Sequence, residues 1–197
     1  MLTIKTILSV LAILLIFVSY SFYIKDILKG KTKPHVFTWG LWSLIISILF
    51  LLQLSAGAGT GAFPTLFVSL LCLTVFILSL IKEEDKNIKP IDVVFLIMTL
   101  LTIPIWLLTK SPTISTILLI IVYSFAGEGT IRKSWVDPYS ETLSLWSINA
   151  FRGLLSILAL SKLNFITLAF PVAVFLGALG ISSILIFRRN ILKLKKK

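Results

Sequence analysis

The chain contains one ten-residue stretch twice: Pro34-His35-Val36-Phe37-Thr38-Trp39-Gly40-Leu41-Trp42-Ser43 returns as Pro138-Tyr139-Ser140-Glu141-Thr142-Leu143-Ser144-Leu145-Trp146-Ser147. At a constant offset of 104 residues, the two copies share a proline, a threonine, a leucine, a tryptophan and a serine. Each copy follows a short charged loop and opens a long apolar segment. Because self-similarity at a fixed spacing is typical of folds built from related units, the stretch predicts that the two halves of the chain fold alike.

Two shorter matches extend the repeat to the neighbouring segments. Tyr20-Ser21-Phe22 returns as Tyr123-Ser124-Phe125, and Ala62-Phe63-Pro64 returns as Ala169-Phe170-Pro171. Each half therefore holds three matching apolar segments, and the segment between the halves has no counterpart. A cleaved signal peptide would have no reason to be repeated, so we count the first segment as a transmembrane helix.

The composition is that of an integral membrane protein. Hydrophobic residues make up 57% of the chain, charged residues 14%, and the mean hydropathy is +1.04. Soluble domains contain roughly 45–50% apolar residues, and one soluble core could not bury so many apolar segments. We therefore expect an all-α integral membrane protein with seven transmembrane helices. They are expected at about 7–24, 36–54, 62–81, 91–109, 112–126, 140–160 and 164–187.

The distribution of Lys and Arg predicts the orientation. With seven helices, fifteen of these residues lie on one side of the membrane, and three, Lys5, Lys110 and Lys162, lie on the other. The positive-inside rule then places the N-terminus outside and the C-terminus in the cytoplasm, in a cell (inner) membrane of bacterial type. A linker helix, 85–110, separates the three-helix units 1–84 and 111–197, and this extra crossing makes the units parallel, related by an axis along the membrane normal.

Other classes of function find little support. The net charge of +11 is compatible with nucleic-acid binding, but the cations flank membrane segments, so we expect no nucleic-acid partner. Cys72 lies in an apolar segment and is expected to pack there, and His35 is expected at the membrane interface. The sequence has no Ser/His pair, no paired intramembrane carboxylates and no metal-ligand spacing, so neither an enzyme nor a metal or cofactor is expected. The sequence leaves the oligomeric state open, a homo-oligomer included.

Arg152 is the sharpest single signal. It lies eleven residues beyond Glu141, or about 16 Å along a helix, near the middle of a hydrocarbon core about 30 Å thick. An arginine at that depth costs at least about 2.5–3.5 kcal/mol, so it is expected to face a cavity or a partner. At about 100° per residue, Trp146, Asn149 and Arg152 share one face, together with Gly153 and Ser156.

The residues allow three interpretations of Arg152. Arg152 and Asn149 bind a polar or anionic ligand on which Trp146 stacks; or Arg152 bonds to backbone carbonyls or pairs with Glu128 or Glu141; or it snorkels to the interface. The matching position in the first half is Ile48, so a binding site there would be asymmetric. Glu128 is either a proton acceptor in coupled transport or a solvated loop residue.

The second helix offers a matching wall. Trp39, Trp42 and Gln53 share one face; Trp39 fits an interfacial anchor, whereas Trp42 lies deeper and matches Trp146. The two matched tryptophans are expected to form aromatic walls of a cavity, and Gln53 to act as a gate or interface residue. Pro34 and Pro138 form a matched pair that is interpreted either as hinges or as simple helix boundaries.

This arrangement resembles the PQ-loop superfamily, and within it the SWEET-type transporters, in a bacterial branch with a similar Pro-x-x-x-Thr-Trp-x-x-Trp helix start. The family's proline matches Pro34 and Pro138, whereas His35 and Tyr139 stand where the family has glutamine. The asparagines that SWEET-type proteins carry within the third and seventh helices are missing here. Nicotinamide-riboside permeases share the same general fold, so the fold alone does not choose a substrate.

The resemblance implies alternating access, in which two three-helix bundles rock about a central cavity. The sequence therefore predicts a transporter or facilitator of a small polar solute, embedded in the lipid bilayer, with a substrate site at Trp42, Trp146, Asn149 and Arg152. The alternative is a non-transporting membrane receptor or assembly factor, which would have a filled bundle with the two tryptophans facing lipid or packed together.

Overall fold

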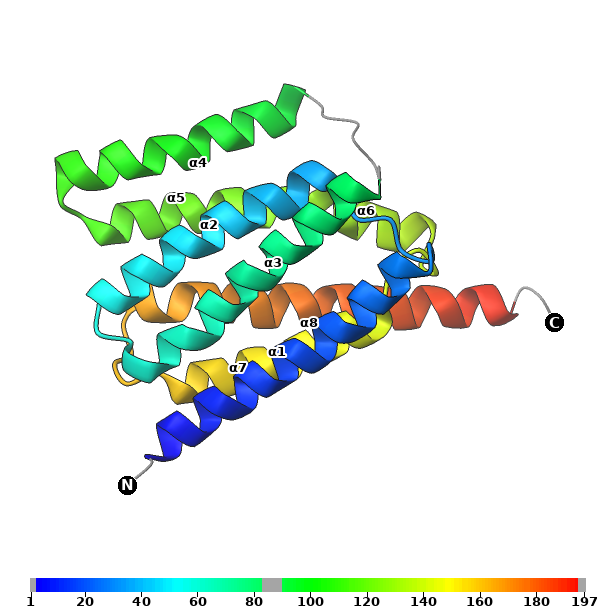
Figure 1. Cartoon of the computed structure of the whole chain (residues 1–197), viewed down its shortest axis with the longest axis horizontal. Coiled ribbons are helices and arrows are strands. Elements are labelled where there is room, and N and C mark those ends of the chain that lie inside the picture. The colour runs from blue at the N-terminus through cyan, green and yellow to red at the C-terminus, as the bar shows by residue number, and fades with distance from the viewer. Residues whose placement is uncertain (1–2, 83–89, 195–197) are drawn as a thin grey trace.

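A computed structural model describes residues 3–82 and 90–194 of the chain. Within these ranges the regular structure is helical throughout. Figure 1 shows the helices α1 (Ile4–Leu28), α2 (Val36–Ser55), the 3₁₀ turn η1 (Gly59–Ala62), α3 (Phe63–Ile81), α4 (Pro90–Thr109), α5 (Pro112–Ala126), α6 (Glu128–Val136), α7 (Leu143–Ala159) and α8 (Phe165–Leu194).

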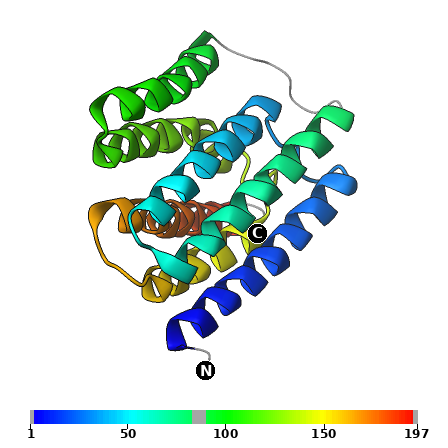
Figure 2. The same cartoon turned by 60° about the vertical axis from the view of Figure 1, so that its left-hand side comes forward.

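Six of the described helices form a closed ring. Going round it, α1 packs on α3, α3 on α2, α2 on α5, α5 on α8, α8 on α7, and α7 returns to α1. Helix α4 lies outside the ring against α5 (Figure 2). The two contacts of this ring that span the most sequence, α1 with α7 and α2 with α5, therefore close the bundle, and the apolar core lies inside the ring.

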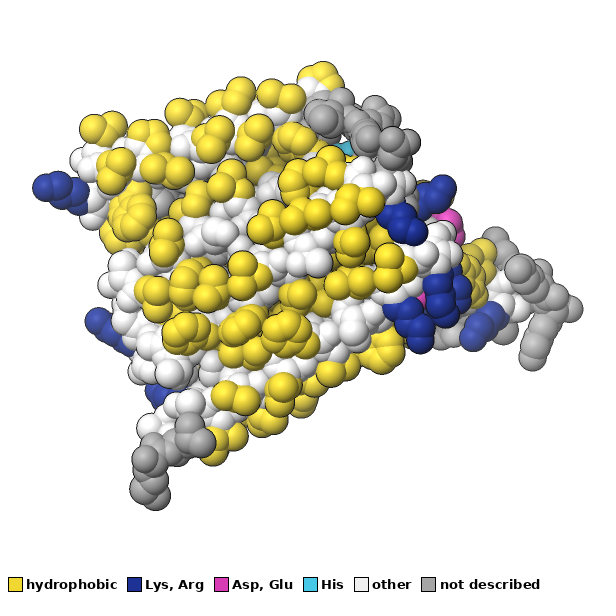
Figure 3. Space-filling model, viewed as in Figure 1, with side chains coloured by type: hydrophobic (Ala, Val, Ile, Leu, Met, Phe, Trp, Pro, Cys, Tyr) yellow, Lys and Arg dark blue, Asp and Glu magenta, His cyan; other side chains and the backbone are white. Residues whose placement is uncertain are grey.

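The bundle has two ends of different charge. Successive long helices run in alternating directions, and the N- and C-termini lie at opposite ends (Figure 1). The end that holds the C-terminus, called here the basic end, carries most of the described Lys and Arg side chains (Figure 3). These are Lys25, Lys29, Lys31, Lys33, Lys82, Arg132, Lys133, Arg188, Arg189 and Lys193. The other end, called the opposite end, carries Lys5, Lys110 and Lys162.

The outer surface is that of a protein embedded in lipid. Large apolar side chains are exposed along α1, α3, α4, α5 and α8, and they cover the face seen in Figure 3. Five described segments are long and apolar enough to cross a membrane: Ile4–Leu28, Val36–Ser55, Gly59–Ile81, Pro112–Val136 and Phe165–Lys193. Val93–Thr109 and Leu143–Ala159 are shorter apolar helices. The protein is thus an α-helical membrane protein.

The fifth predicted segment is longer than its apolar stretch. Helix α5 has the predicted bounds, but Gly127 alone separates it from α6, which the sequence did not predict. Together they make one 25-residue segment, Pro112–Val136, long enough to span a bilayer core of about 30 Å. The sequence predicted no helix between the segments 112–126 and 140–160, and this prediction is wrong. The prediction of helices rested on apolar periodicity, which the polar sequence of α6 lacks.

The start predicted for the sixth segment is also wrong. Helix α7 begins at Leu143, not at residue 140, because the residues before it are used in tertiary contacts. The Glu141 carbonyl accepts a hydrogen bond from Arg189 Nη2 at 2.6 Å, and the Thr142 hydroxyl donates to Asp26 Oδ2 at 2.7 Å. An acidic side chain at this position also interacts favourably with the positive end of the α7 dipole.

Candidate functional site

A cavity of about 290 Å³ lies inside the ring, and every ring helix contributes to its wall. Four of its lining residues are those that the sequence singled out as substrate-binding: Trp42 on α2, and Trp146, Asn149 and Arg152 on α7. Its lining comes close to the basic end on α2 and α7, and on α3 and α8 it includes residues of the half toward the opposite end, such as Val68 and Ala173. None of it comes from the connections at the opposite end. The tertiary structure therefore brings together predicted residues that are more than a hundred positions apart.

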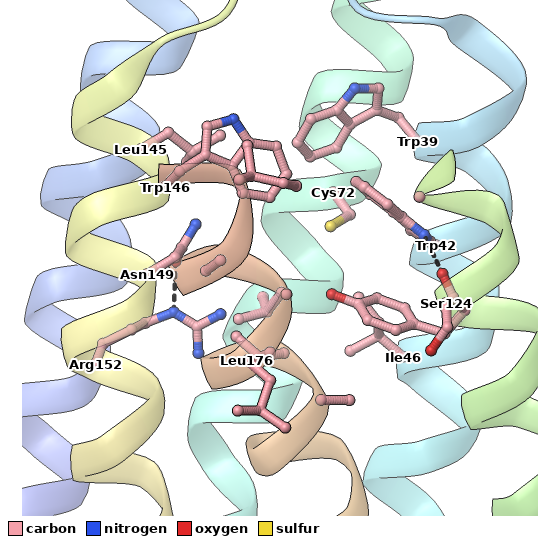
Figure 4. Close-up of a pocket in the computed structure, with 18 of the residues that line it drawn as sticks. Trp39, Trp42, Ile46, Cys72, Ser124, Leu145, Trp146, Asn149, Arg152 and Leu176 are labelled. Carbon is pink, nitrogen blue, oxygen red and sulfur yellow. Dashed lines mark hydrogen bonds between the residues drawn. The ribbon is translucent and has the colours of Figure 1, made fainter. Parts of the chain in front are cut away.

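Arg152 is buried, with 3% of its surface exposed, and it faces this cavity. Its Nε donates to Asn149 Oδ1 at 2.6 Å, one turn earlier on α7. Figure 4 shows the guanidinium pointing into the space between α7 and the helices across the cavity. Among the described residues its side chain makes no other hydrogen bond and no ion pair. Its positive charge is thus held inside the bundle without a neighbouring carboxylate.

The position of α7 follows from small residues on its buried side. A Cβ on Gly153 would lie 3.0 Å from Phe175 Cα, so a glycine allows the backbones of α7 and α8 to approach closely. The Ser156 hydroxyl donates to the Arg152 carbonyl at 3.0 Å, within the same helix. Packed in this way, α7 turns Arg152 away from lipid, where a charged side chain is costly.

The wall across the cavity from Arg152 is aromatic. The ring centroids of Trp39 and Trp42 are 5.4 Å apart, and the Trp42 centroid lies 5.5 Å from that of Tyr123. Tyr20 packs edge-on against Trp39, with centroids 6.1 Å apart. These separations fall within the favourable range of about 4.5–7 Å for aromatic pairs. Trp42 Nε1 also donates to the Tyr123 carbonyl at 3.3 Å, which fixes the indole across the α2–α5 contact.

Trp146 is fixed from the basic end. Its Nε1 donates to Glu141 Oε2 at 3.3 Å, and the other carboxylate oxygen accepts from Lys133 Nζ at 3.1 Å. Glu141 is 4% exposed and Lys133 33%, so this ion pair lies at the boundary between the cavity wall and solvent. The carboxylate therefore joins a cavity residue on α7 to α6.

The three residues predicted as hinge or gate do not line the cavity. Pro34 and Pro138 are both buried, ahead of α2 and of the turn that precedes α7. The Pro138 carbonyl accepts two hydrogen bonds from Arg189, at 3.0 Å from Nε and 2.8 Å from Nη2. A hinge role for the prolines stays a prediction.

Gln53 instead completes the hydrogen bonding of another helix. It is fully buried, and its Nε2 donates to the Thr167 carbonyl at 3.1 Å. That carbonyl lies four residues before Pro171, which has no N–H to donate to it. Gln53 Oε1 has no hydrogen-bond partner within the described residues. This side chain therefore joins α2 to α8 near the opposite end.

The structure excludes two of the alternatives for Arg152, and contact with a ligand stays a prediction. Arg152 does not pair with Glu141, whose carboxylate is taken by Lys133 and Trp146, and its side chain is buried rather than extended to the interface. The Glu128 side chain lies outside the described residues, so the predictions for it are not assessed. His35 caps α2, with Nδ1 2.9 Å from the Thr38 hydroxyl.

Sequence reasoning missed most of the lining residues, and three of these carry a phenol or a thiol. Tyr20, Cys72 and Tyr123 all line the cavity, and the Tyr20 hydroxyl lies 3.3 Å from Cys72 Sγ. The two tyrosines occupy the same place in the Tyr-Ser-Phe match, so the repeat itself carries a signal for this pair. Cys72 is buried, as expected, but in a cavity wall.

Comparisons of the chain with protein-family models, with curated proteins and with solved structures give no match. The chemical character of the site thus comes from its own residues. A guanidinium, an amide and the Trp146 indole lie on α7, the other indole and phenol rings come from other helices, and the rest of the lining is mostly aliphatic. Such an arrangement binds a small molecule through a few directed polar contacts and broad apolar contact.

Proposed function

We propose that the chain is a membrane transporter or facilitator that moves a small polar solute by alternating access between two three-helix units, as in PQ-loop and SWEET-type proteins. The units are residues 1–84 and 111–197, joined by the linker helix within 85–110. In this proposal the basic end faces the cytoplasm of a bacterial-type inner membrane.

The helix contacts support the division into two units. The order of packing is α1–α3–α2 in the first half and α5–α8–α7 in the second, so in each half the last helix lies between the other two. The contacts between the halves are reciprocal: the first helix of each half packs on the middle helix in sequence of the other, α1 on α7 and α5 on α2. Parallel repeats in transporters are related in this way by an axis along the membrane normal.

The observation that carries the proposal is the cavity between these halves. The cavity holds an arginine without a carboxylate partner among the described residues. The alternative, a receptor or assembly factor, predicts a filled bundle without such a cavity. Intramembrane ionisable residues commonly mark substrate pathways.

In this proposal, the contacts between the two halves at the opposite end form a closed gate. The Ser161 N–H donates to the Ala58 carbonyl at 3.1 Å, and Asn164 Nδ2 donates to the Ala56 carbonyl at 3.2 Å. A Cβ on Gly61 would lie 2.7 Å from Leu160 Cα, so the two connections meet backbone to backbone. Alternating access requires these contacts to separate while the basic end closes.

Thiol accessibility tests the proposal without knowledge of the solute. In a Cys72→Ala background, Ala173→Cys places a single thiol on the cavity wall, and a membrane-impermeant maleimide is added to one face of oriented vesicles at a time. Alternating access predicts that this thiol is modified from either face. Phe187→Cys, an exposed control near the basic end, is expected to react from that face alone. The labelling is repeated in the presence of each member of a panel of sugars, nucleosides, vitamins, amino acids and organic anions. If Ala173→Cys reacts from the basic face only under all of these conditions, the transport proposal is overturned and a receptor is favoured.

A further inference from the structure

We propose that the cavity binds a flat, single-ring organic acid in its anionic form, with the carboxylate on Arg152 and the ring between the aromatic walls. This inference rests on the proposed function, because it names the class of solute for the same cavity. It concerns binding, however, and is tested separately from movement across the membrane.

The hydrogen-bonding groups of the α7 wall call for an acceptor. Arg152 has five N–H donors, and the Nε–H is used by Asn149 Oδ1, which leaves the two Nη groups directed into the cavity. Because Asn149 uses its oxygen on Arg152, its amide nitrogen also remains as a donor to the cavity. A carboxylate offers acceptors only, and it matches a guanidinium in a two-point arrangement. A sugar hydroxyl neutralises no charge and leaves the guanidinium without a counter-ion.

The charge balance of the site points to one negative charge. The neighbouring cations are already engaged: Lys133 pairs with Glu141, and Arg189 is bonded to backbone carbonyls. Arg152 is therefore the one cation among the described lining residues. A monocarboxylate compensates it, whereas a second buried anionic group would remain unpaired at a high cost in free energy.

The walls and the volume favour a flat ring. Trp39, Trp42 and Trp146 contribute to the lining toward the basic end, and Tyr123 packs against Trp42 across the α2–α5 contact. Figure 4 shows Asn149 and Arg152 on one side of the cavity and Trp42 on the other. A cavity of about 150 Å³ holds benzene. The volume here, about 290 Å³, therefore accommodates one ring with an acidic substituent but not a nucleotide.

Approach from the basic end suits an anion. The Lys and Arg side chains at that end create a positive potential (Figure 3), and the lining residues Trp39 and Leu145 lie in the first turns of α2 and α7, which begin at that end. A positive surface raises the local concentration of anions and their association rate, and the effect falls as salt rises. We therefore expect the association rate of a ring carboxylate, more than its dissociation rate, to depend on ionic strength.

The first experiment compares three probes on the purified, detergent-solubilised protein: benzoate, benzamide and cyclohexanecarboxylate. Binding is followed by tryptophan fluorescence, because three of the five tryptophans line the cavity, and by the melting temperature. Benzoate is expected to bind most tightly. Benzamide, a neutral analogue of similar shape, is expected to bind at least about tenfold more weakly, since hydrogen bonds to charged groups are among the strongest in proteins. Cyclohexanecarboxylate keeps the charge but loses the flat ring, and it is expected to fall between the other two.

Variants assign the charge to one residue. Arg152→Gln is expected to abolish the preference for benzoate over benzamide, and Arg152→Lys to retain part of it, because lysine keeps the charge without the two-point geometry. Lys162→Gln is the matched control: it removes the same charge at the opposite end, outside the cavity lining, and is expected to leave the preference unchanged. The comparison of probes on the wild-type protein needs no variant, so a misfolded Arg152 variant would not remove the test.

The outcomes separate this inference from the transport proposal. Equal binding of benzoate and benzamide to the wild type, or a preference that survives in a folded Arg152→Gln variant, would overturn the inference. Benzoate binding without uptake into proteoliposomes, together with cavity labelling from one face only, would retain the inference and reject transport. Uptake of a neutral solute without benzoate binding would overturn the inference and retain the transport proposal.

Discussion

The two copies of the repeated stretch begin α2 and α7, and the two helices use the same frame for different chemistry. Trp42 and Trp146 match in sequence, and both line the cavity. Six residues further on, α2 has Ile48 in the apolar core, whereas α7 has Arg152 in the cavity wall. The matched tryptophans are also fixed differently, one by a backbone carbonyl on α5 and the other by the Glu141 carboxylate. The shared residues thus supply the shape, and the differing ones supply the charge.

The prolines of the Ala-Phe-Pro match give a second comparison. The carbonyl four residues before each proline lacks the usual helical N–H donor. Ser9 on α1 donates to the Thr60 carbonyl at 2.7 Å in the first half, and Gln53 on α2 donates to the Thr167 carbonyl in the second. In the first half the Thr60 carbonyl also accepts from the Phe63 N–H in the 3₁₀ turn. The side-chain donors come from different helices, and in both halves they come from residues 1–84.

The largest effect is expected when α2 is given the charge of α7. Ile48→Arg places a second cation in the apolar core with no acceptor provided, which costs at least about 2.5–3.5 kcal/mol at this depth. We expect loss of the folded bundle, measured as a lower melting temperature and aggregation on size exclusion. Ile48→Leu, which keeps the core apolar, is the control. A fully stable Ile48→Arg protein would show that the two helices are more alike than the packing indicates.

A smaller loss is expected where the halves meet at the opposite end. Gly61→Ala places a Cβ 2.7 Å from Leu160 Cα and 2.8 Å from the Ala159 carbonyl oxygen, so backbone must move. Overpacking of this kind costs about 1–3 kcal/mol. The matched change Gly180→Ala meets no atom within 4 Å and is expected to leave the melting temperature unchanged or raise it, since alanine favours helix. Equal melting temperatures for the two variants would contradict a tight closed end.

The proline comparison predicts a coupled pair. Gln53→Leu removes the donor to the Thr167 carbonyl and is expected to cost about 1 kcal/mol, because the lost hydrogen bond is partly offset by removal of the unpartnered Oε1. Pro171→Ala restores a backbone N–H four residues after Thr167, so the double variant is expected to recover much of the loss. A double-mutant cycle on melting free energies measures the coupling. Strictly additive effects would show that Gln53 does not substitute for the missing N–H.

The smallest effect is expected at Glu141. Glu141→Gln removes the charge that pairs with Lys133 but keeps an oxygen able to accept from Trp146 Nε1. Because Lys133 is 33% exposed, the stability change is expected to stay below about 1 kcal/mol. The tryptophan emission is expected to shift in this variant, and the same measurement in Glu141→Gln/Trp146→Phe shows whether Trp146 is the source. An unchanged emission maximum in Glu141→Gln would argue that the charge of the carboxylate does not influence that indole.

Much of the arrangement could be predicted because the relevant signals are local and periodic. Apolar runs of about the right length gave the long helices, and the 3.6-residue period put Trp146, Asn149 and Arg152 on the buried side of α7. The period fails where polar residues serve tertiary contacts, as in α6 and in the turn around Glu141. It placed Gln53 on the face of Trp39 and Trp42, but it could not indicate that the hydrogen-bond partner of Gln53 lies on α8.

The sequence by itself determined that this is a helical membrane protein with a buried arginine, because hydropathy and helical period are properties of single segments. Only the tertiary structure decided what faces that arginine. Tyr20 and Cys72 reach the cavity, and Lys133 rather than Arg152 takes the Glu141 carboxylate, through packing between helices far apart in the chain. Such contacts depend on which helices are neighbours and how closely their backbones approach, and a one-dimensional pattern does not encode either quantity.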